Sequence, residues 1–199
     1  QTLRKKPVRL YVMGANQWRE YEGYPPKAIE RRMYLGGEGK LDEKVGDAVP
    51  DQYCYDPADP TPIVGGTQFH LWGGARDNRG LERRRDVLTY TSAKLETALE
   101  IIGPVRLELF VKSSLEHTDF FGRLCDVYPD GRSINICDGL FRVTPESGEK
   151  QADGSLRFEI DMWATAYRFR KGHRMRLLVS SGAHPRWSRH TGSSSPLTD

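Results

Sequence analysis

The stretch VRLELFVK at residues 105–112 decides the fold class, because aliphatic and charged side chains alternate along it. A period of two is the spacing at which side chains of a β-strand point to the same face. We therefore predict a strand with its charged residues in water and a buried face formed by Val105, Leu107, Leu109 and Val111. One buried and one solvated face is typical of antiparallel sheets, since parallel sheets are covered on both sides.

The same alternation recurs along the chain, and turn signals separate its occurrences. It is found at residues 8–12, 158–162 and 175–179. The clearest hairpin is predicted at residues 126–136. There Pro129-Asp130-Gly131 combines a proline that presets φ with a glycine that can adopt the positive φ closing the turn. Several short strands separated by such turns predict an all-β fold, a two-sheet β-sandwich.

Helical periodicity is weak throughout the sequence. Residues 94–101 fit a helical turn or two, which Gly103-Pro104 would end just ahead of the predicted strand. Residues 14–66 are rich in Gly, Pro, Asp and Tyr and read as long excursions between short strands. Loops of that length usually have a function or lie on a neighbouring domain.

Length and charge restrict the class of protein. The chain has 199 residues, which suits one domain, and its first residue is Gln1, so we expect residues 1–199 to be a single domain cut from a larger polypeptide. The net charge is +3 and basic residues are interleaved with acidic ones, so no nucleic-acid partner is expected. No apolar run approaches the roughly 18 residues of a membrane span, and no signal-peptide core is visible.

The cysteines favour a reducing compartment. Cys54, Cys125 and Cys137 are an odd number without dense spacing, which argues against a disulfide framework and places the protein in the cytoplasm. Cys125 and Cys137 flank the predicted hairpin, so a bridge between them is possible, but two half-buried thiols are the simpler expectation. No spacing of His or Cys suggests a metal site, and no cofactor motif is present.

The stretch SSGAHPRWSRH at residues 180–190 contains the residue types of a serine hydrolase. A serine nucleophile needs a base within hydrogen-bond reach, and in α/β-hydrolases it lies in Gly-x-Ser-x-Gly, a motif absent here. We therefore expect Ser180 and Ser181 to end a strand, with His184 and His190 as packing or surface residues. Arg186 is expected to stack on Trp187 and fix the loop.

Two further groups of side chains have both a structural and a functional interpretation. Four aspartates surround the hairpin, and we expect them on solvated strand faces rather than as a pair for acid–base chemistry: Asp119, Asp126, Asp130 and Asp138. Seven aromatic residues lie in the loop-rich first part of the chain: Tyr11, Trp18, Tyr21, Tyr24, Tyr34, Phe69 and Trp72. They suit a sugar-stacking platform, a patch that docks a partner, or packing beneath long loops.

Six ordered motifs give the chain a resemblance to a known family. They are VRLYVMGANQWR from residue 8, YDPADPTP from residue 55, RDVLTY from residue 85, GHR from residue 172 and PRW from residue 185, with a further motif between residues 118 and 139. That motif consists of TDF, DVYPDGR and DG in this order. Together they resemble the C-terminal domain of the X-prolyl dipeptidyl-peptidase and cocaine esterase family of serine hydrolases. The resemblance implies a jelly-roll β-sandwich with a galactose-binding-like fold.

The resemblance also implies a role. The family's catalytic triad belongs to a preceding α/β-hydrolase domain of the same polypeptide, so no residue of this chain is expected to be catalytic and the isolated segment should be inactive. The sandwich domain would stabilise the enzyme, help to wall its acyl-binding pocket for a small ester or peptide substrate, and be able to support a homodimer. By position, Phe69 and Gln68 in the loop 65–70 are the expected substrate-proximal residues.

Two alternatives stay open on the sequence. The first is a carbohydrate-binding module with a jelly-roll fold, which would present a narrow aromatic platform, whereas an accessory domain would expose a broad apolar face. The second is an independent hydrolase that uses His184 or His190. The chain also departs from the family near residues 181–186 and in its tail from Ser193, where a missing terminal strand would leave an exposed sheet edge.

Overall fold

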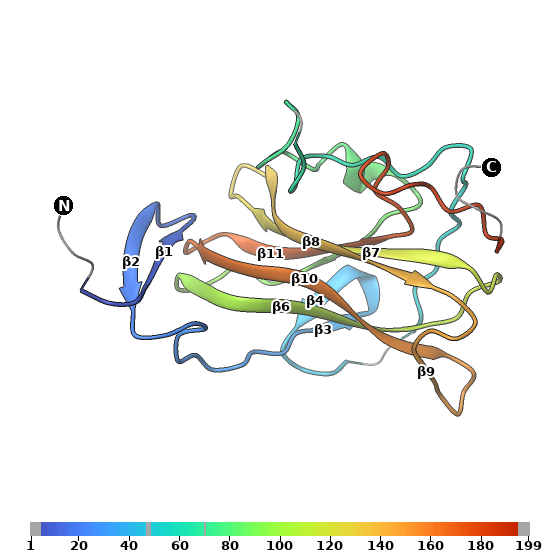
Figure 1. The fold of residues 1–199 in the computed structure, drawn as a ribbon, viewed down its shortest axis with the longest axis horizontal. Helices are drawn as coiled ribbons and strands as arrows, with labels where there is room; N and C mark the ends of the chain where they lie inside the picture. The colour runs from blue at the N-terminus through green and yellow to red at the C-terminus, as the bar shows by residue number, and fades with distance from the viewer. Residues whose placement is uncertain (1–4, 47–48, 70, 195–199) are drawn as a thin grey trace.

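The computed structural model describes residues 5–46, 49–69 and 71–194, and it is almost entirely built of β-strands (Figure 1). The strands are β1 (Val8–Val12), β2 (Gln17–Tyr21), β3 (Tyr34–Gly36), β4 (Lys40–Asp42), β5 (Leu88–Thr91), β6 (Leu99–Val111), β7 (Thr118–Val127), β8 (Ser133–Val143), β9 (Glu149–Lys150), β10 (Leu156–Phe169) and β11 (Arg174–Ser180). The helical segments in the described ranges are two 3₁₀ turns, η1 (Gly37–Gly39) and η2 (Leu81–Arg83). Neither has the length and apolar character needed to cross a bilayer.

Two sheets pack face to face, and a separate ribbon lies at one end of them (Figure 1). The larger sheet has the strand order β3-β4-β5-β11-β7-β8, and the smaller sheet has the order β6-β10-β9. All pairings between these named strands are antiparallel except the single parallel bridge between β4 and β5. The all-β jelly-roll sandwich predicted from the sequence is confirmed.

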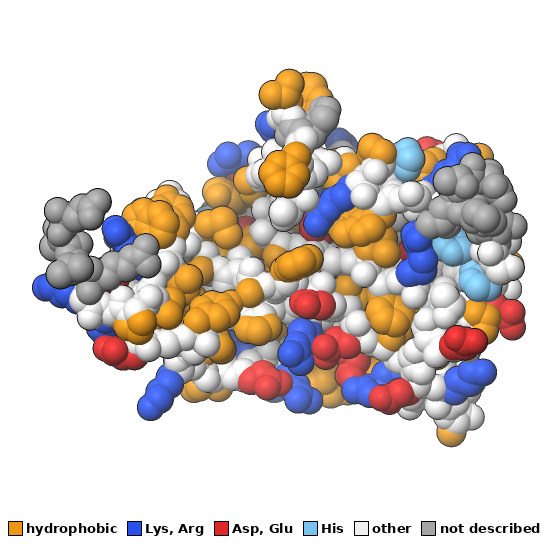
Figure 2. Space-filling model, in the orientation of Figure 1, with side chains coloured by type: hydrophobic (Ala, Val, Ile, Leu, Met, Phe, Trp, Pro, Cys, Tyr) orange, Lys and Arg blue, Asp and Glu red, His pale blue; other side chains and the backbone are white. Residues whose placement is uncertain are grey.

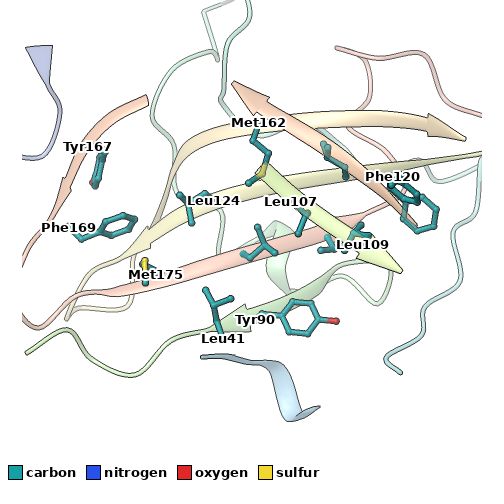
Figure 3. Close-up of a cluster of buried hydrophobic side chains, with 14 of the residues drawn as sticks. Leu41, Tyr90, Leu107, Leu109, Phe120, Leu124, Met162, Tyr167, Phe169 and Met175 are labelled. Carbon is teal, nitrogen blue, oxygen red and sulfur yellow. The ribbon is translucent and has the colours of Figure 1, made fainter. Parts of the chain in front are cut away.

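The core fills the space between the sheets, as Figure 3 shows. The smaller sheet contributes alternate residues of β6 and β10, among them Leu107, Leu109 and Ile160. Facing residues such as Phe120 and Leu177 come from β7 and β11 of the larger sheet. The face predicted for residues 105–111 therefore points inward, with Leu107 and Leu109 buried and Val105 and Val111 half-buried. Burial of these side chains is the main term that stabilises the sandwich.

The helical turn predicted at residues 94–101 is wrong. Strand β6 already begins at Leu99, where it pairs with Phe169 of β10, and residues 94–98 form no helix. Gly103-Pro104 lies inside this strand rather than ahead of it. Local propensity is a weak constraint here because the antiparallel pairing with β10 draws residues from Leu99 onward into the sheet.

A β-bulge in β10 lies opposite this proline. The register with β6 shifts between Asp161 and Ala164, and Trp163 takes a positive φ of 65° within the bulge. The Asp161 carboxylate accepts a hydrogen bond from the Trp163 backbone N–H at 2.8 Å. The bulge also presses the Asp161 carbonyl against Gly139 of β8, where a Cβ would lie only 2.1 Å from the oxygen. The bulge leaves the Trp163 side chain 68% exposed.

The outer face of the larger sheet is covered as well. A second, small apolar cluster joins Cys125 and Leu178 of the sheet to Leu81 and Val87 of the preceding segment. The covering is made by the long segments 61–87 and 181–190, which run along the upper side of the molecule in Figure 1. Strand β7 is consequently buried on both faces, from Asp119 to its end at Val127.

The β7–β8 hairpin forms as predicted. The Tyr128 N–H donates to the Arg132 carbonyl at 2.8 Å, and Gly131 has the positive φ, 88°, that the turn requires. The flanking cysteines are free thiols on opposite faces of the sheet, since Cys125 belongs to the outer cluster and Cys137 packs against the inner core. The possible bridge between them is therefore excluded by the strand geometry.

Candidate functional site

A loop at residues 65–74 brings together three large, exposed apolar side chains. Phe69 is fully exposed, Leu71 is 89% exposed and Trp72 is 68% exposed. Figure 2 shows the hydrophobic side chains of this loop as a projection above the body of the molecule. His70, which belongs to the segment predicted to approach substrate, lies outside the described residues. Exposed apolar side chains in such a concentration are typical of an interaction site.

The base of the loop is closed by backbone hydrogen bonds. Gly66 and Gly74 each donate an N–H to the other's carbonyl, both at 2.8 Å. The Gln68 side chain does not extend toward the tip, because its amide donates to the Gly65 carbonyl at 3.2 Å. Arg76 donates to the Leu71 carbonyl at 2.8 Å and so ties the tip to the returning arm of the loop. The loop thus has a closed neck and a projecting apolar tip.

A buried charged cluster lies directly under this neck. Arg123 of β7 is completely buried, and its Nη2 donates to Asp138 Oδ2 of β8 at 2.8 Å. Its Nη1 donates to the Val64 carbonyl, just before the loop, and to the Asn78 side-chain oxygen at 2.7 Å. Arg186 donates to the other carboxylate oxygen, Asp138 Oδ1. We call Arg123, Asp138 and Arg186 the neck cluster.

Glycine is required where the neck meets the cluster. A Cβ on Gly66 would lie 2.7 Å from Asp138 Oδ2, 3.0 Å from Arg123 Nη2 and 3.4 Å from Arg186 Nη1. Gly66 also has a positive φ of 87°. Both the close approach and the left-handed backbone disfavour a side chain here, so the loop backbone can lie close to the charged groups.

The stretch at residues 180–190 forms the outer wall of the neck. His184 forms a β-bridge with Pro62, and the Ile63 N–H donates to the His184 carbonyl at 2.8 Å. The Arg186 guanidinium stacks on Trp187 at 4.1 Å from the ring centroid, as predicted, and Trp187 in turn packs against Phe121. This C-terminal segment therefore delivers Arg186 to the loop neck.

The serines of this stretch are held in structural contacts. Ser180 donates to the Gly182 carbonyl at 3.1 Å, and Ser181 shares a 2.7 Å hydrogen bond with the Tyr53 hydroxyl. Burial raises the pKa of Tyr53 to about 12, so this phenol is neutral and is not a general base. His190 is buried and stacks on His117. Among the hydrogen bonds of the described residues, neither serine contacts a histidine, which argues against an independent hydrolase.

The prediction that the four aspartates around the hairpin are solvated is wrong for three of them. Asp130 is at the exposed turn, but Asp119, Asp126 and Asp138 are each buried to 4% exposure or less. Asp119 accepts two hydrogen bonds from Arg142, at 2.8 and 2.7 Å. For Asp119 and Asp138 the reason is that the long segments, rather than water, cover the outward face of β7 and β8. Asp126 lies on the opposite face of β7, toward Tyr167 of the inner core.

Asp126 belongs to a separate buried network that the sequence did not indicate. Its carboxylate contacts His173 Nδ1 at 2.9 Å and accepts a 2.8 Å hydrogen bond from the Tyr167 hydroxyl. Burial raises the pKa of Asp126, and the hydrogen bonds from Tyr167 and His173 partly offset this. Tyr128 packs on the imidazole at 4.4 Å between ring centroids. The network joins the hairpin to β10 and the start of β11.

An open groove of about 460 Å³ lies beside the loop. It is lined by Thr67 of the loop, Asp138 of the neck cluster, Trp163 of the bulge, and Met13 and Tyr24 from the N-terminal segment. The Thr165 hydroxyl, in the same lining, is buried without a hydrogen-bond partner. Figure 2 shows further hydrophobic side chains spread from the N-terminal ribbon along the middle of this view. The apolar surface is therefore broad.

Two of the aromatic residues considered for a sugar platform do not form a flat surface. Tyr11 and Trp18 of the ribbon meet edge to face, with 63° between their planes, and Arg9 lies 5.0 Å from the Trp18 ring centroid. Most of the seven aromatics are exposed, but Tyr21 is half-buried. Within the described ranges, no three His, Cys, Asp or Glu side chains come together as a possible metal site.

Arg123 was not identified as a site residue from the sequence, although the sequence contains a signal for its burial. It interrupts an apolar run of a central strand, FFGRLCDV at residues 120–127. A charged residue at such a position is almost never fully buried unless it is paired, and this signal predicts a nearby carboxylate.

Comparisons with known proteins agree with this geometry. Residues 3–197 match the family described as the X-Pro dipeptidyl-peptidase C-terminal non-catalytic domain. The cocaine esterase of Rhodococcus sp. (strain MB1 Bresler) is 39% identical over 207 residues, which cover 92% of this chain and 35% of the esterase.

Solved structures show the same fold. An aminopeptidase from the marine sediment archaeon Thaumarchaeota archaeon matches with a TM-score of 0.85 and 24% identity over 100% of this chain and 37% of its own. An α-amino acid ester hydrolase matches with a TM-score of 0.84 and 25% identity over 96% of this chain and 36% of its own. The chain thus spans about a third of the length of these relatives.

Proposed function

Since the chain belongs to the family of X-Pro dipeptidyl-peptidase C-terminal non-catalytic domains, we propose that it is the accessory domain of a serine hydrolase. The catalytic serine, histidine and aspartate would lie in a preceding α/β-hydrolase domain of the same polypeptide. The parent reaction would be hydrolysis of an ester or X-Pro peptide substrate through a serine acyl-enzyme.

The loop 65–74 is the observation that carries the proposal. A fully exposed Phe69 on a closed neck stabilises nothing within this domain, so its apolar surface is available to another body. We propose that Phe69 forms part of the wall of the acyl-binding pocket, with Gln68 at the base of the same loop. An apolar wall binds the acyl group and keeps water away from it, which contributes to substrate preference without supplying a catalytic group.

The broad apolar surface supports docking onto the hydrolase domain. Exposed Tyr24, Trp163 and Met13 line the groove beside the loop, and Trp18 extends the surface onto the ribbon. A stand-alone domain rarely leaves so many large apolar side chains in water. The carbohydrate-binding alternative is less well supported, because the edge-to-face pair of Tyr11 and Trp18 offers no flat platform for a sugar ring.

Ester hydrolysis by the isolated chain and by the full-length parent tests the proposal. With p-nitrophenyl acetate and an aminoacyl p-nitroanilide, we expect turnover by the parent and none by the isolated chain. A control variant, Ser180→Ala/Ser181→Ala, removes both hydroxyls of the C-terminal segment. Turnover by the isolated chain that disappears in this variant would overturn the non-catalytic assignment.

A further inference from the structure

We infer that the neck cluster holds the loop 65–74 in the position that the acyl-binding pocket requires, and that Arg186 is the residue of the cluster through which this position can be changed. The inference rests on the proposed function of Phe69 and adds residues that no substrate would touch. Arg186, Asp138 and Arg123 would act through the loop backbone, so they are positioning residues rather than catalytic residues.

The hydrogen bonds of the neck cluster form a continuous chain. Arg186 orients Asp138 through Oδ1, and Asp138 holds Arg123 through Oδ2. Arg123 then donates to the Val64 carbonyl at the entry to the loop. A chain of charged hydrogen bonds therefore runs from the C-terminal segment to the first residue of the neck.

The return side of the loop is anchored to the larger sheet, which also carries Arg123 and Asp138. Asn135 of β8 donates to the Gly74 carbonyl at 3.0 Å and accepts from the Arg76 N–H at 2.8 Å. Asn78, which contacts Arg123, also donates to the Arg76 carbonyl at 2.8 Å. Entry and exit of the loop are thus fixed relative to β7 and β8.

The charged side chains of the neck cluster are largely buried. The side chains of Arg123, Asp138 and Arg186 are 0%, 3% and 15% exposed. Two guanidinium groups share one carboxylate where water is scarce, so loss of one contact forces the remaining groups to rearrange. A Cβ placed on Gly66 would lie within 3.4 Å of an atom of each of the three side chains, so no side chain separates the cluster from the loop backbone. A rearrangement of the cluster is therefore transmitted to the loop backbone.

Binding of an acyl group against Phe69 is favoured when the loop is already fixed. A mobile loop would lose conformational entropy each time an acyl group bound against Phe69, and this loss would weaken binding. A loop held in place before binding avoids it. The cluster should accordingly affect the affinity for large acyl groups much more than the rate of the chemical step.

The test uses the full-length parent with Arg186→Met, which keeps the aliphatic stem and removes the guanidinium. Arg142→Met is the matched control, because Arg142 also pairs with a buried aspartate of β7, Asp119, and also touches the C-terminal segment at the Ser188 carbonyl. It does not contact residues 64–66 in any hydrogen bond of the described structure. Arg186→Lys is a milder variant that retains the charge and keeps the test open if Arg186→Met fails to fold.

We expect amide hydrogens of residues 65–69 and 71–74 to exchange at least about tenfold faster in Arg186→Met than in the parent or in Arg142→Met. KM for esters with large acyl groups should rise by about fivefold while kcat stays within about twofold. Arg186→Lys should shift both quantities in the same direction by less. In the Phe69→Ala background, Arg186→Met should raise KM no further, because its effect passes through the loop.

Equal exchange rates in Arg186→Met and Arg142→Met would overturn the inference, as would additive effects of Arg186→Met and Phe69→Ala on KM. Failure of the proposed function gives a different result. In that case Phe69→Ala alone leaves KM unchanged, while hydrogen exchange still decides whether Arg186 positions the loop.

Discussion

The Arg123 guanidinium and the Asp138 carboxylate form a buried ion pair, with 2.8 Å between Nη2 and Oδ2. The pair bridges β7 and β8 beneath the loop 65–74, and it satisfies a backbone carbonyl and an asparagine side chain as well. A buried ion pair of this kind stabilises little compared with an apolar replacement of both partners, but removal of one partner leaves a charge without compensation.

Arg123→Met is therefore expected to destabilise the protein by about 3 kcal/mol. The substitution leaves the Val64 carbonyl and the Asn78 side chain without their donor and weakens the support of Asp138. Denaturant unfolding measures the change. Arg79→Met, which breaks the exposed pair with Asp77, is the control and should alter stability by less than about 0.5 kcal/mol. Equal effects of the two substitutions would contradict the burial of the neck cluster.

Gly131→Val should destabilise the β7–β8 hairpin by roughly 1 kcal/mol or more, because valine rarely adopts the positive φ of this position. A Cβ at Gly131 would meet nothing within 4 Å, so the backbone conformation alone is tested. Gly80 is equally open but has a φ of −66°. Gly80→Val should leave the melting temperature nearly unchanged. A melting temperature for Gly131→Val that matches this control would exclude the turn geometry.

The three thiols should differ sharply in reactivity. Burial raises the pKa values of Cys125 and Cys137 to about 12, whereas Cys54 is exposed. At about pH 8 a thiol reagent should label Cys54 in the native protein and reach the other two only after unfolding. Peptide mass mapping after a short exposure to iodoacetamide distinguishes the three sites. Rapid native labelling of Cys125 would show that the outer cluster is open to solvent.

His190 should make stability sensitive to mild acid. Burial lowers its pKa, the positive charges of Arg142 and His117 lower it further, and Asp119 opposes them. The neutral ring also accepts a hydrogen bond from the Gly192 N–H at Nδ1. Because the folded-state pKa is below the unfolded value of about 6.5, this stabilisation is present above that pH and is lost as pH falls through the folded-state pKa.

The measurement for His190 is the melting temperature from about pH 7.5 to pH 5 for the wild type and for His190→Asn, whose side-chain oxygen can accept the same hydrogen bond. The wild type should lose more stability than the variant over this range. Parallel curves would mean that His190 titrates alike in the folded and unfolded protein.

Alternation of side chains was sufficient to predict several of the strands and the face of β6 that forms the core. Residues 105–111 and 158–162 point the same side chains inward as the pattern indicated. The turn at Gly131 and the stacking of Arg186 on Trp187 were predictable as well, because both depend on neighbours in sequence. Each of these features has a local physical cause.

Features that depend on distant segments were not predictable in this way. A period of two separates the two faces of β7 but does not say that segments 61–87 and 181–190 cover the outer one. For this reason Asp119 and Asp138 were expected in water, whereas both are buried in ion pairs. The positive φ of Trp163 likewise depends on a register shift against β6, which no local pattern specifies.

Substrate preference of the full-length parent and its Phe69→Ala variant tests the central claim most directly. We would measure kcat/KM for p-nitrophenyl esters of increasing acyl length, with Ile29→Ala as a control, since Ile29 is 95% exposed outside the loop. If Phe69 walls the acyl pocket, kcat/KM for the longest ester should fall by about tenfold while that for the acetate changes by less than about twofold. The melting temperature should stay the same, because Phe69 packs against nothing in this domain. An unchanged acyl-length profile together with a lower melting temperature would make Phe69 a packing residue and contradict the account.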